Sequence, residues 1–235
     1  MLLHRGLKVC LLAGVLILLM SGLCLCRKGE ENRMVAYMEQ KYGESFAVME
    51  SYAGQFGKDY TMLRMRSISR NREGVLVRAS GRADIAYQDN YLAYLLKEEI
   101  EYRLAQSAKA SLGECKVFYK IPDLVFPAEF PADMEADAFL RHPQSKVRVY
   151  IYVRDCSVDI QKRVDDFFSQ MQKQKYIIGG VISCPMDEVM YEMITEENFR
   201  GDVYLGYQSV TEAFFSMDEL GKLVYLEWKG EIPNE

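Results

Sequence analysis

Hydrophobic side chains recur at four-residue steps through residues 89–119, the longest regular pattern in the chain. The repeat consists of Leu92, Leu96, Ile100, Leu104, Ala108 and Leu112. This spacing produces one apolar stripe on a helix of about six turns. Asp89 and Asn90 are residue types that cap the start of a helix, and Gly113 is the type that ends one.

Segments on both sides of this helix alternate between apolar and polar positions, as strands do. Residues 46–52, 60–67 and 74–79 precede the helix, and residues 115–120 follow it. Turn-forming residues separate the first three segments, which predicts an antiparallel sheet. A helix with a wide apolar face needs a sheet to cover, and we expect these three strands to supply it.

The charged residues of the long helix fall off its apolar stripe, so we expect them on the solvated side. They are Lys97, Glu98, Glu101, Arg103 and Lys109. A second amphipathic helix is predicted at residues 31–42, where Met34 and Met38 share a face and Gly43 follows.

Prolines interrupt the alternation after residue 120. Pro122, Pro127, Pro131 and Pro143 all fall within residues 121–144, and proline is excluded from the interior of a sheet. A connection of this length is uncommon inside one compact unit. We therefore predict a subdomain boundary here, with a short helix within residues 132–140.

The second half opens with the clearest strand pattern of the chain. One side of this strand carries Val147, Val149, Ile151 and Val153. The other side carries Arg148, Tyr150, Tyr152 and Arg154. Strict alternation of this kind indicates a strand with one buried face.

A helix and three more strands are predicted after it. The apolar stripe of the helix at residues 158–173 consists of Ile160, Val164, Phe167, Phe168 and Met171. Its expected cap is Ser157 or Asp159. Residues 176–183, with two adjacent glycines, predict a strand or a bulged pair. Residues 211–217 and 222–228 predict a hairpin.

This order of elements places the chain in the α+β class, with amphipathic helices packed on antiparallel sheets. We expect a membrane or signal segment at residues 1–28 and a subdomain at residues 29–121. The proline-rich connection at residues 122–145 then leads to a second subdomain at residues 146–235.

Residues 9–26 carry no charge and follow a short basic stretch. Eighteen such residues are near the lower limit for crossing a bilayer. An uncleaved membrane anchor is the favoured interpretation; a cleaved secretory signal and a lipoprotein signal stay open, although Leu23 suits neither cleavage site. We expect a single-pass protein of the cell membrane with an extracytoplasmic body.

The composition is that of an ordinary globular protein, with 235 residues and a net charge of −5. So mild a charge argues against a nucleic-acid binder, which is usually strongly basic. The charge is uneven, however. Residues 58–82 carry seven basic and two acidic side chains, whereas residues 187–235 carry twelve acidic and three basic ones.

Arginines in the basic stretch are the candidate ligand-binding residues, because the guanidinium suits bidentate binding of phosphate or carboxylate. They are Arg64, Arg66, Arg70, Arg72 and Arg78. The expected partner is an anionic lipid or a wall polymer. The plainer alternative is a solvated sheet edge that resists aggregation.

The chain offers no motif for catalysis, metal binding or a cofactor. HExxH, GxSxG, P-loop and Rossmann patterns are absent, and His142 stands in the proline-rich connection. Neighbouring acidic pairs at residues 98–99, 165–166 and 196–197 could in principle supply a general acid and base. The first two pairs lie on predicted helices with charged neighbours, which favours a solvated face. We therefore predict no catalytic residue, no metal ligand and no cofactor.

Three cysteines lie beyond the N-terminal segment: Cys115, Cys156 and Cys184. Their spacing is not that of a zinc site. Buried free thiols are the favoured interpretation, and one disulfide with one free thiol is the alternative.

The uncharged N-terminal segment, the YMEQKYGESF step from helix to strand and the DNYLAYLLKEE helix start together resemble small uncharacterised membrane-anchored proteins of Gram-positive bacteria. The likeness extends to residue 120. It implies a location in the cell envelope and brings no catalytic motif with it.

The sequence is therefore compatible with two functions. The first is a non-enzymatic envelope protein that binds a partner or wall polymer; the alternative is a hydrolase or transferase whose site is assembled from scattered residues. A deep pocket with converging carboxylates or His142 favours the enzyme. A shallow face with basic or aromatic residues, such as Tyr150 and Tyr152, favours binding.

Overall fold

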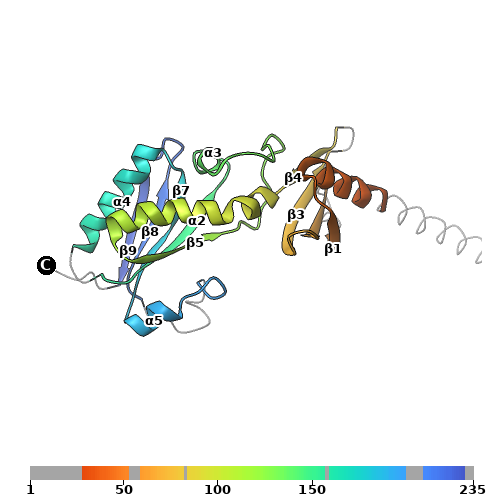
Figure 1. Ribbon diagram of the computed structural model, residues 1–235. Coiled ribbons are helices and arrows are strands. Elements are labelled where there is room, and N and C mark those ends of the chain that lie inside the picture. Colours follow the sequence, from red (N-terminus) through yellow and green to blue (C-terminus); the bar gives the residue numbers. More distant parts are fainter. Residues whose placement is uncertain (1–27, 53–58, 82–83, 157–158, 200–208, 231–235) are drawn as a thin grey trace, which may run out of the picture. The chain divides into compact units, whose positions relative to one another are not determined.

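The computed structural model describes residues 28–52, 59–81, 84–156, 159–199 and 209–230. The predicted anchor, the basic residues Lys58 and Arg82 and the proposed cap Ser157 lie outside these ranges. Within them, no helix has both the length and the apolar character needed to cross a bilayer. The chain divides into two compact units, Met1–Asp89 and Asn90–Glu235, each with a sheet of its own (Figure 1).

The first unit packs a helix over residues 28–42 on a four-stranded antiparallel sheet (Figure 1). The strands, in spatial order, are β1 (Phe46–Tyr52), β2 (Tyr60–Ser67), β3 (Arg72–Ser80) and β4 (Ala86–Asp89). Three of them were predicted. The fourth was not, because four residues are too few to show an alternating pattern.

The core of this unit follows from the predicted patterns. Alternate positions of β2 and β3 put Leu63, Met65, Val75 and Val77 on one face of the sheet, all fully buried. Met34 and Met38 of the helix are also fully buried, so the helix covers this face. The long helix predicted to cover this sheet packs elsewhere.

Asp89 ties the helix of the first unit to β4. Its buried carboxylate accepts hydrogen bonds from the Tyr37 hydroxyl at 2.9 Å and the Tyr42 hydroxyl at 2.7 Å, and it pairs with Lys41 at 2.7 Å. These partners offset the cost of burying a charge. The predicted cap Asn90 makes no side-chain hydrogen bond to the long helix and instead donates its side-chain N–H to the Pro122 carbonyl.

The second unit contains a five-stranded mixed sheet. Its strands, in spatial order, are β5 (Cys115–Lys120), β6 (Val147–Val153), β7 (Ile178–Pro185), β8 (Ser209–Met217) and β9 (Leu223–Gly230). The pairing of β6 with β7 is parallel and the others are antiparallel. A parallel pair was not predicted; α4 (Ile160–Gln174) makes the crossover that such a pair requires.

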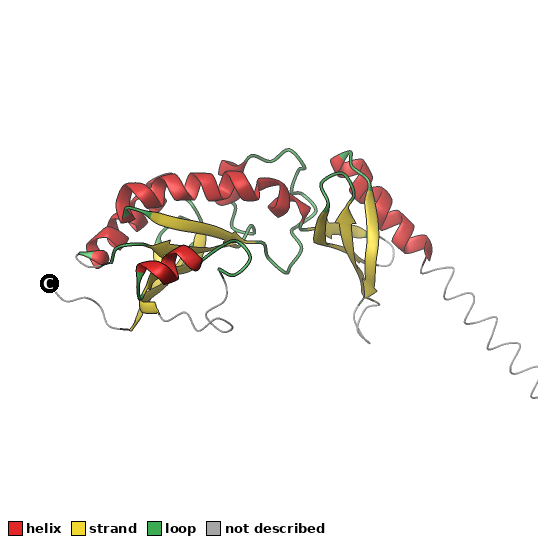
Figure 2. Cartoon of the chain, turned by 60° about the horizontal axis from the view of Figure 1, so that its bottom comes forward, coloured by secondary structure: helices red, strands yellow, loops and turns green. Residues whose placement is uncertain are grey.

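Two helices cover one face of this sheet, as Figures 1 and 2 show. They are α4 and α2 (Tyr91–Leu112), and both contribute to one core with the inward residues of β5–β8. The five predicted stripe residues of α4 are all buried. The long helix α2 thus belongs to the second unit, which corrects the predicted boundary: the chain divides between Asp89 and Asn90, not within residues 122–145.

The proline-rich connection is part of the same core. Phe126 and Phe130 stack with ring centroids 5.3 Å apart, and Phe139 of α3 (Ala136–Leu140) meets both rings edge-on. All three rings are buried. The short helix was predicted, but the segment fills the core of the second unit and does not link two subdomains.

The solvated side of α2 was predicted only in part. Ile100 is fully buried as expected, whereas Leu96 is half-buried at the rim of the core. Glu101 was expected in solvent, but its side chain is only 20 % exposed. Its Oε1 accepts a hydrogen bond from the backbone N–H of Tyr119 at 2.7 Å. This carboxylate therefore satisfies a backbone donor on the edge strand β5.

Cys156 and Cys184 form a disulfide with a Cα–Cα distance of 6.0 Å, and Cys115 is a buried free thiol. The favoured prediction of three free thiols was wrong and the alternative is correct. The adjacent glycines of β7 form no bulge against β6, where the register is continuous. A Cβ on Gly180 would stand 1.9 Å from the Val149 carbonyl oxygen, so the two strands approach each other there as only glycine permits.

Candidate functional site: the open face of the second sheet

The face of the second sheet away from α2 and α4 is built in three rows, because residues paired across strands point the same way. The first row consists of Lys120, Arg148, Gly179, Ser216 and Tyr225. The second consists of Phe118, Tyr150, Val181, Phe214 and Glu227. The third consists of Lys116, Tyr152, Ser183, Glu212 and Lys229.

Residues 186–199, which include α5 (Glu188–Met193), lie over one end of this face; we call them the α5 segment. Its Phe199 ring stacks on Phe118 with centroids 4.9 Å apart and meets Tyr150 edge-on at 5.4 Å. The Tyr152 hydroxyl donates to the Phe199 carbonyl. An aromatic cluster therefore closes the part of the face around Tyr152.

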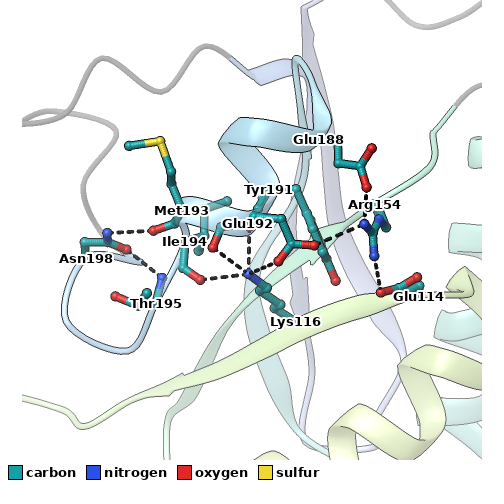
Figure 3. Close-up of polar contacts among 10 residues, drawn as sticks. All are labelled: Glu114, Lys116, Arg154, Glu188, Tyr191, Glu192, Met193, Ile194, Thr195 and Asn198. Atoms are coloured by element: carbon teal, nitrogen blue, oxygen red, sulfur yellow. Dashed lines mark hydrogen bonds and ion pairs between the residues drawn. The ribbon is translucent and has the colours of Figure 1, made fainter.

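Basic side chains of the sheet hold the α5 segment (Figure 3). Lys116 Nζ donates to the carbonyl oxygens of Tyr191 at 2.8 Å, Glu192 at 3.1 Å and Ile194 at 3.1 Å. These carbonyls stand at the C-terminal end of α5, where helix carbonyls lack partners and attract cations. Lys116 thus binds the end of the helix as a cap.

Arg154 binds acidic side chains in both the first and the last turn of α5. It pairs with Glu188, with Glu192 at 3.1 Å and with Glu114 of the β5 approach at 2.6 Å (Figure 3). The Tyr191 ring lies near both cations, 4.7 Å from Lys116 Nζ and 5.5 Å from the Arg154 guanidinium carbon. Burial raises the pKa of Tyr191 to about 12, so this phenol stays neutral at physiological pH.

The other end of the face is a shallow hollow of about 320 Å³. It is lined by Arg148, Tyr150, Gly179, Gly180, Val181, Phe214, Phe215, Ser216 and Tyr225. Gly179 contributes no side chain, so the sheet backbone itself forms the floor. The rim combines a guanidinium, a serine hydroxyl and tyrosine rings, a mixture typical of binding surfaces.

The predicted ligand-binding arginines lie in the first unit, apart in sequence from this hollow. Alternation places three of them on the sheet face away from the helix, where each contacts a polar side chain of a neighbouring strand. The contacts are Arg64 with Glu50 at 3.7 Å, Arg66 with Glu73 at 3.9 Å and Arg78 with Gln88 at 3.0 Å.

The other two predicted arginines sit at the turn between β2 and β3. Arg70 Nε bonds to Glu44 at 2.7 Å, and Arg72 opens β3 opposite Ser67. The five therefore do not form one convergent cluster among the described residues. An anion that bound them would compete with Glu44, Glu50 and Glu73.

Among the described residues, His142 and the cysteines do not converge on one site. His142 packs its ring on Phe130 at 4.4 Å, and Cys184 is in the disulfide. Burial raises the pKa of the Cys115 thiol to about 11, which leaves it protonated at neutral pH. Across the described ranges, no three of the His, Cys, Asp and Glu side chains are grouped so that they could hold a metal ion.

Sequence reasoning recognised the tyrosines of β6 as a possible recognition surface but not the residues around them. The alternation of β6 shows that Arg148 shares a face with Tyr150. Phe214, Ser216 and Tyr225 come from the distant hairpin, and only the sheet order brings them beside β6 and β7. No local pattern reveals that order.

Comparison with known proteins identifies no family for this chain. No family model matches the chain, and a search of curated proteins gives no match. Among solved structures, the chain is similar to a DUF5037 family protein from Ruminococcus gnavus ATCC 29149, with 10 % identity and a TM-score of 0.42. The match covers 82 % of this chain and 93 % of that one.

Proposed function

We propose that this protein is a membrane-anchored, extracytoplasmic binding protein that holds a component of the cell envelope on the open face of its second sheet. The hollow over Gly179 carries this proposal. It is shallow, its floor is backbone, and its rim presents Arg148, Tyr150 and Tyr225. No carboxylate is among its lining residues and His142 lies elsewhere, which supports binding over a hydrolase or transferase.

The location is proposed from two independent features. The uncharged stretch at residues 9–26 has the length and basic flank of an anchor. The Cys156–Cys184 disulfide suits a body outside the cytoplasm, because structural disulfides persist in oxidising compartments. Both features support a body exposed to the wall and to the outer surface of the membrane.

A second contact with anionic envelope material is proposed for the arginine-bearing sheet of the first unit. Arg64 and Arg70 keep exposed side chains although they are ion-paired. Exposed ion pairs are weak, so a polyanion can displace the glutamates. Such binding is expected to weaken as salt increases.

Co-sedimentation of the full-length protein with purified Gram-positive cell walls tests the binding function. Val181, half-buried in the middle of the second row, is replaced by Trp to fill the hollow. We expect the bound fraction to fall severalfold for Val181→Trp. The control is Tyr102→Trp, at a 62 % exposed position of α2, the helix that covers the opposite face of the sheet. Equal binding by wild type and Val181→Trp contradicts the proposal.

A further inference from the structure

We infer that the hollow binds an anionic sugar unit, whose carboxylate or phosphate is received by Lys120 and Arg148. This inference rests on the proposed binding function and names its ligand class. It is carried by the charge pattern at the open end of the face, by the size of the hollow and by the chemistry of its rim.

Lys120 and Arg148 stand directly opposite each other on β5 and β6. Like charges in this position destabilise a sheet, because the facing side chains begin only about 5 Å apart at their Cβ atoms. Neither side chain forms a hydrogen bond or an ion pair with any other residue in the described part of the chain. Two opposed cations with no counter-charge among the described residues are a site that an anion stabilises.

The contrast with neighbouring basic residues sharpens this point. In the third row, Lys116 is bound by three carbonyls of the α5 segment. Arg154, the residue that follows β6, is bound by three glutamates. The described part of the chain therefore supplies partners for the cations at one end of the face and none for Lys120 and Arg148 at the other end, where an external anion can bind.

The hollow limits the ligand to a small unit. A volume of about 320 Å³ is at the lower end of the range for ligand sites, which is about 300–1,000 Å³. One six-membered ring with a charged substituent fits this size. A polymer can contribute one such unit at a time.

The rim favours a sugar over a purely apolar ring. Tyr150 and Tyr225 supply aromatic rings with an apolar body. Tyr225, whose hydroxyl donates to Glu227, is 48 % exposed. Ser216 adds a hydroxyl beside the glycine floor. Aromatic faces can cover the C–H side of a pyranose while hydroxyls bond its edge, and a guanidinium grips carboxylate and phosphate equally well.

Calorimetric titration of the full-length protein in detergent tests the inference with three probes: glucuronate, glucose 6-phosphate and glucose. We expect both anions to bind about tenfold or more tightly than glucose, as a charge-assisted contact implies. Arg148→Gln and Lys120→Gln should each lower the affinity for both anions by about tenfold and leave the affinity for glucose unchanged. The matched control is Lys173→Gln, an exposed charge on α4 beyond the other face.

Each result is decisive. Tighter binding of one anion than the other identifies carboxylate or phosphate as the preferred group. Equal affinities for glucose and the anions, or an unchanged affinity in Arg148→Gln, overturn the anionic specificity. No binding of any probe overturns the sugar assignment, whereas the cell-wall experiment with Val181→Trp judges the binding function separately.

Discussion

Tyr119 has a buried hydroxyl that lowers the stability of the fold and that a single substitution can remove. Its side chain is fully buried on the helix-covered face of the sheet, and its hydroxyl has no hydrogen-bond partner among the described residues. Burying an unpaired hydroxyl costs about 1–3 kcal/mol. We expect Tyr119→Phe to raise the free energy of unfolding by about 1 kcal/mol, measured by chemical denaturation.

The matched control is Tyr176→Phe. The Tyr176 hydroxyl donates to Asp137 at 2.6 Å, and this hydrogen bond is the main cause that lowers the pKa of Asp137. Its removal should destabilise the fold by about 1 kcal/mol. A loss of stability in both variants would show that the Tyr119 hydroxyl is satisfied after all.

Glu101 contributes to the stability of the fold, although its place in the helix pattern predicts an exposed side chain. It accepts the backbone N–H of Tyr119 and also pairs with Lys97. Burial raises its pKa, even though both contacts favour the charged form. We expect Glu101→Ala to cost about 1–3 kcal/mol, because the Tyr119 N–H loses its acceptor. Chemical denaturation of Glu101→Ala and of the control Glu99→Ala measures the difference in their free energies of unfolding.

Glu99 is the suitable comparison, since it pairs with Arg103 on the exposed side of the same helix at 2.7 Å. Such a pair is worth about 0.5 kcal/mol or less. Equal unfolding midpoints for Glu99→Ala and Glu101→Ala would show that the Glu101 side chain contributes no more to stability than an exposed one. Glu101→Gln keeps an acceptor oxygen and should fall between them.

At the scale of elements, local patterns predicted what each segment becomes but not what it packs against. Alternation in β6 and the stripe of α4 depend only on neighbours in sequence, and both were predicted residue by residue. The partner of α2 depends on contacts between distant segments. Its stripe suits any apolar sheet face, and nothing in the stripe distinguishes β1–β3 from β5–β8.

The disulfide is the element-scale feature with the largest expected energy. It joins the residues after β6 to β7 across 28 positions that include α4. Closing a loop of this size is expected to stabilise the fold by about 3–4 kcal/mol. We therefore expect a reducing agent to lower the melting temperature of the wild type, measured by circular dichroism.

The double variant Cys156→Ala/Cys184→Ala should melt at the lower temperature with or without the reductant. Cys115→Ala serves as the comparison, because its buried thiol is outside the bridge; it should keep the response to reductant. Labelling of three free thiols beyond residue 27 in the denatured, unreduced protein would exclude the bridge.

At the scale of the whole molecule, the candidate site was predictable only where it depends on one strand. Tyr150 and Arg148 follow from the alternation of β6. The remainder of the hollow requires that the C-terminal hairpin lies beside β7 and that Gly179 leaves space. The predicted arginines fail to converge because the fold gives them separate neighbours, which composition alone does not show: Arg64, Arg66 and Arg70 contact glutamates, and Arg78 contacts a glutamine.

The last prediction concerns how the molecule is held at the membrane. We expect the full-length protein to sediment with membranes and to be released by detergent but not by high salt, because eighteen uncharged residues partition into the bilayer. A variant that lacks residues 1–27 should remain in solution as a folded body. The described helix starts at residue 28 and its first fully buried side chain is Met34, so this cut spares the core of the first unit.

Mass spectrometry separates the alternatives: the complete mass supports an anchor, a shortened chain supports cleavage, and added lipid on Cys24 or Cys26 supports a lipoprotein. Recovery of the complete chain in the soluble fraction would sink the proposed membrane location, while the binding measurements on the open face would stand independently of it.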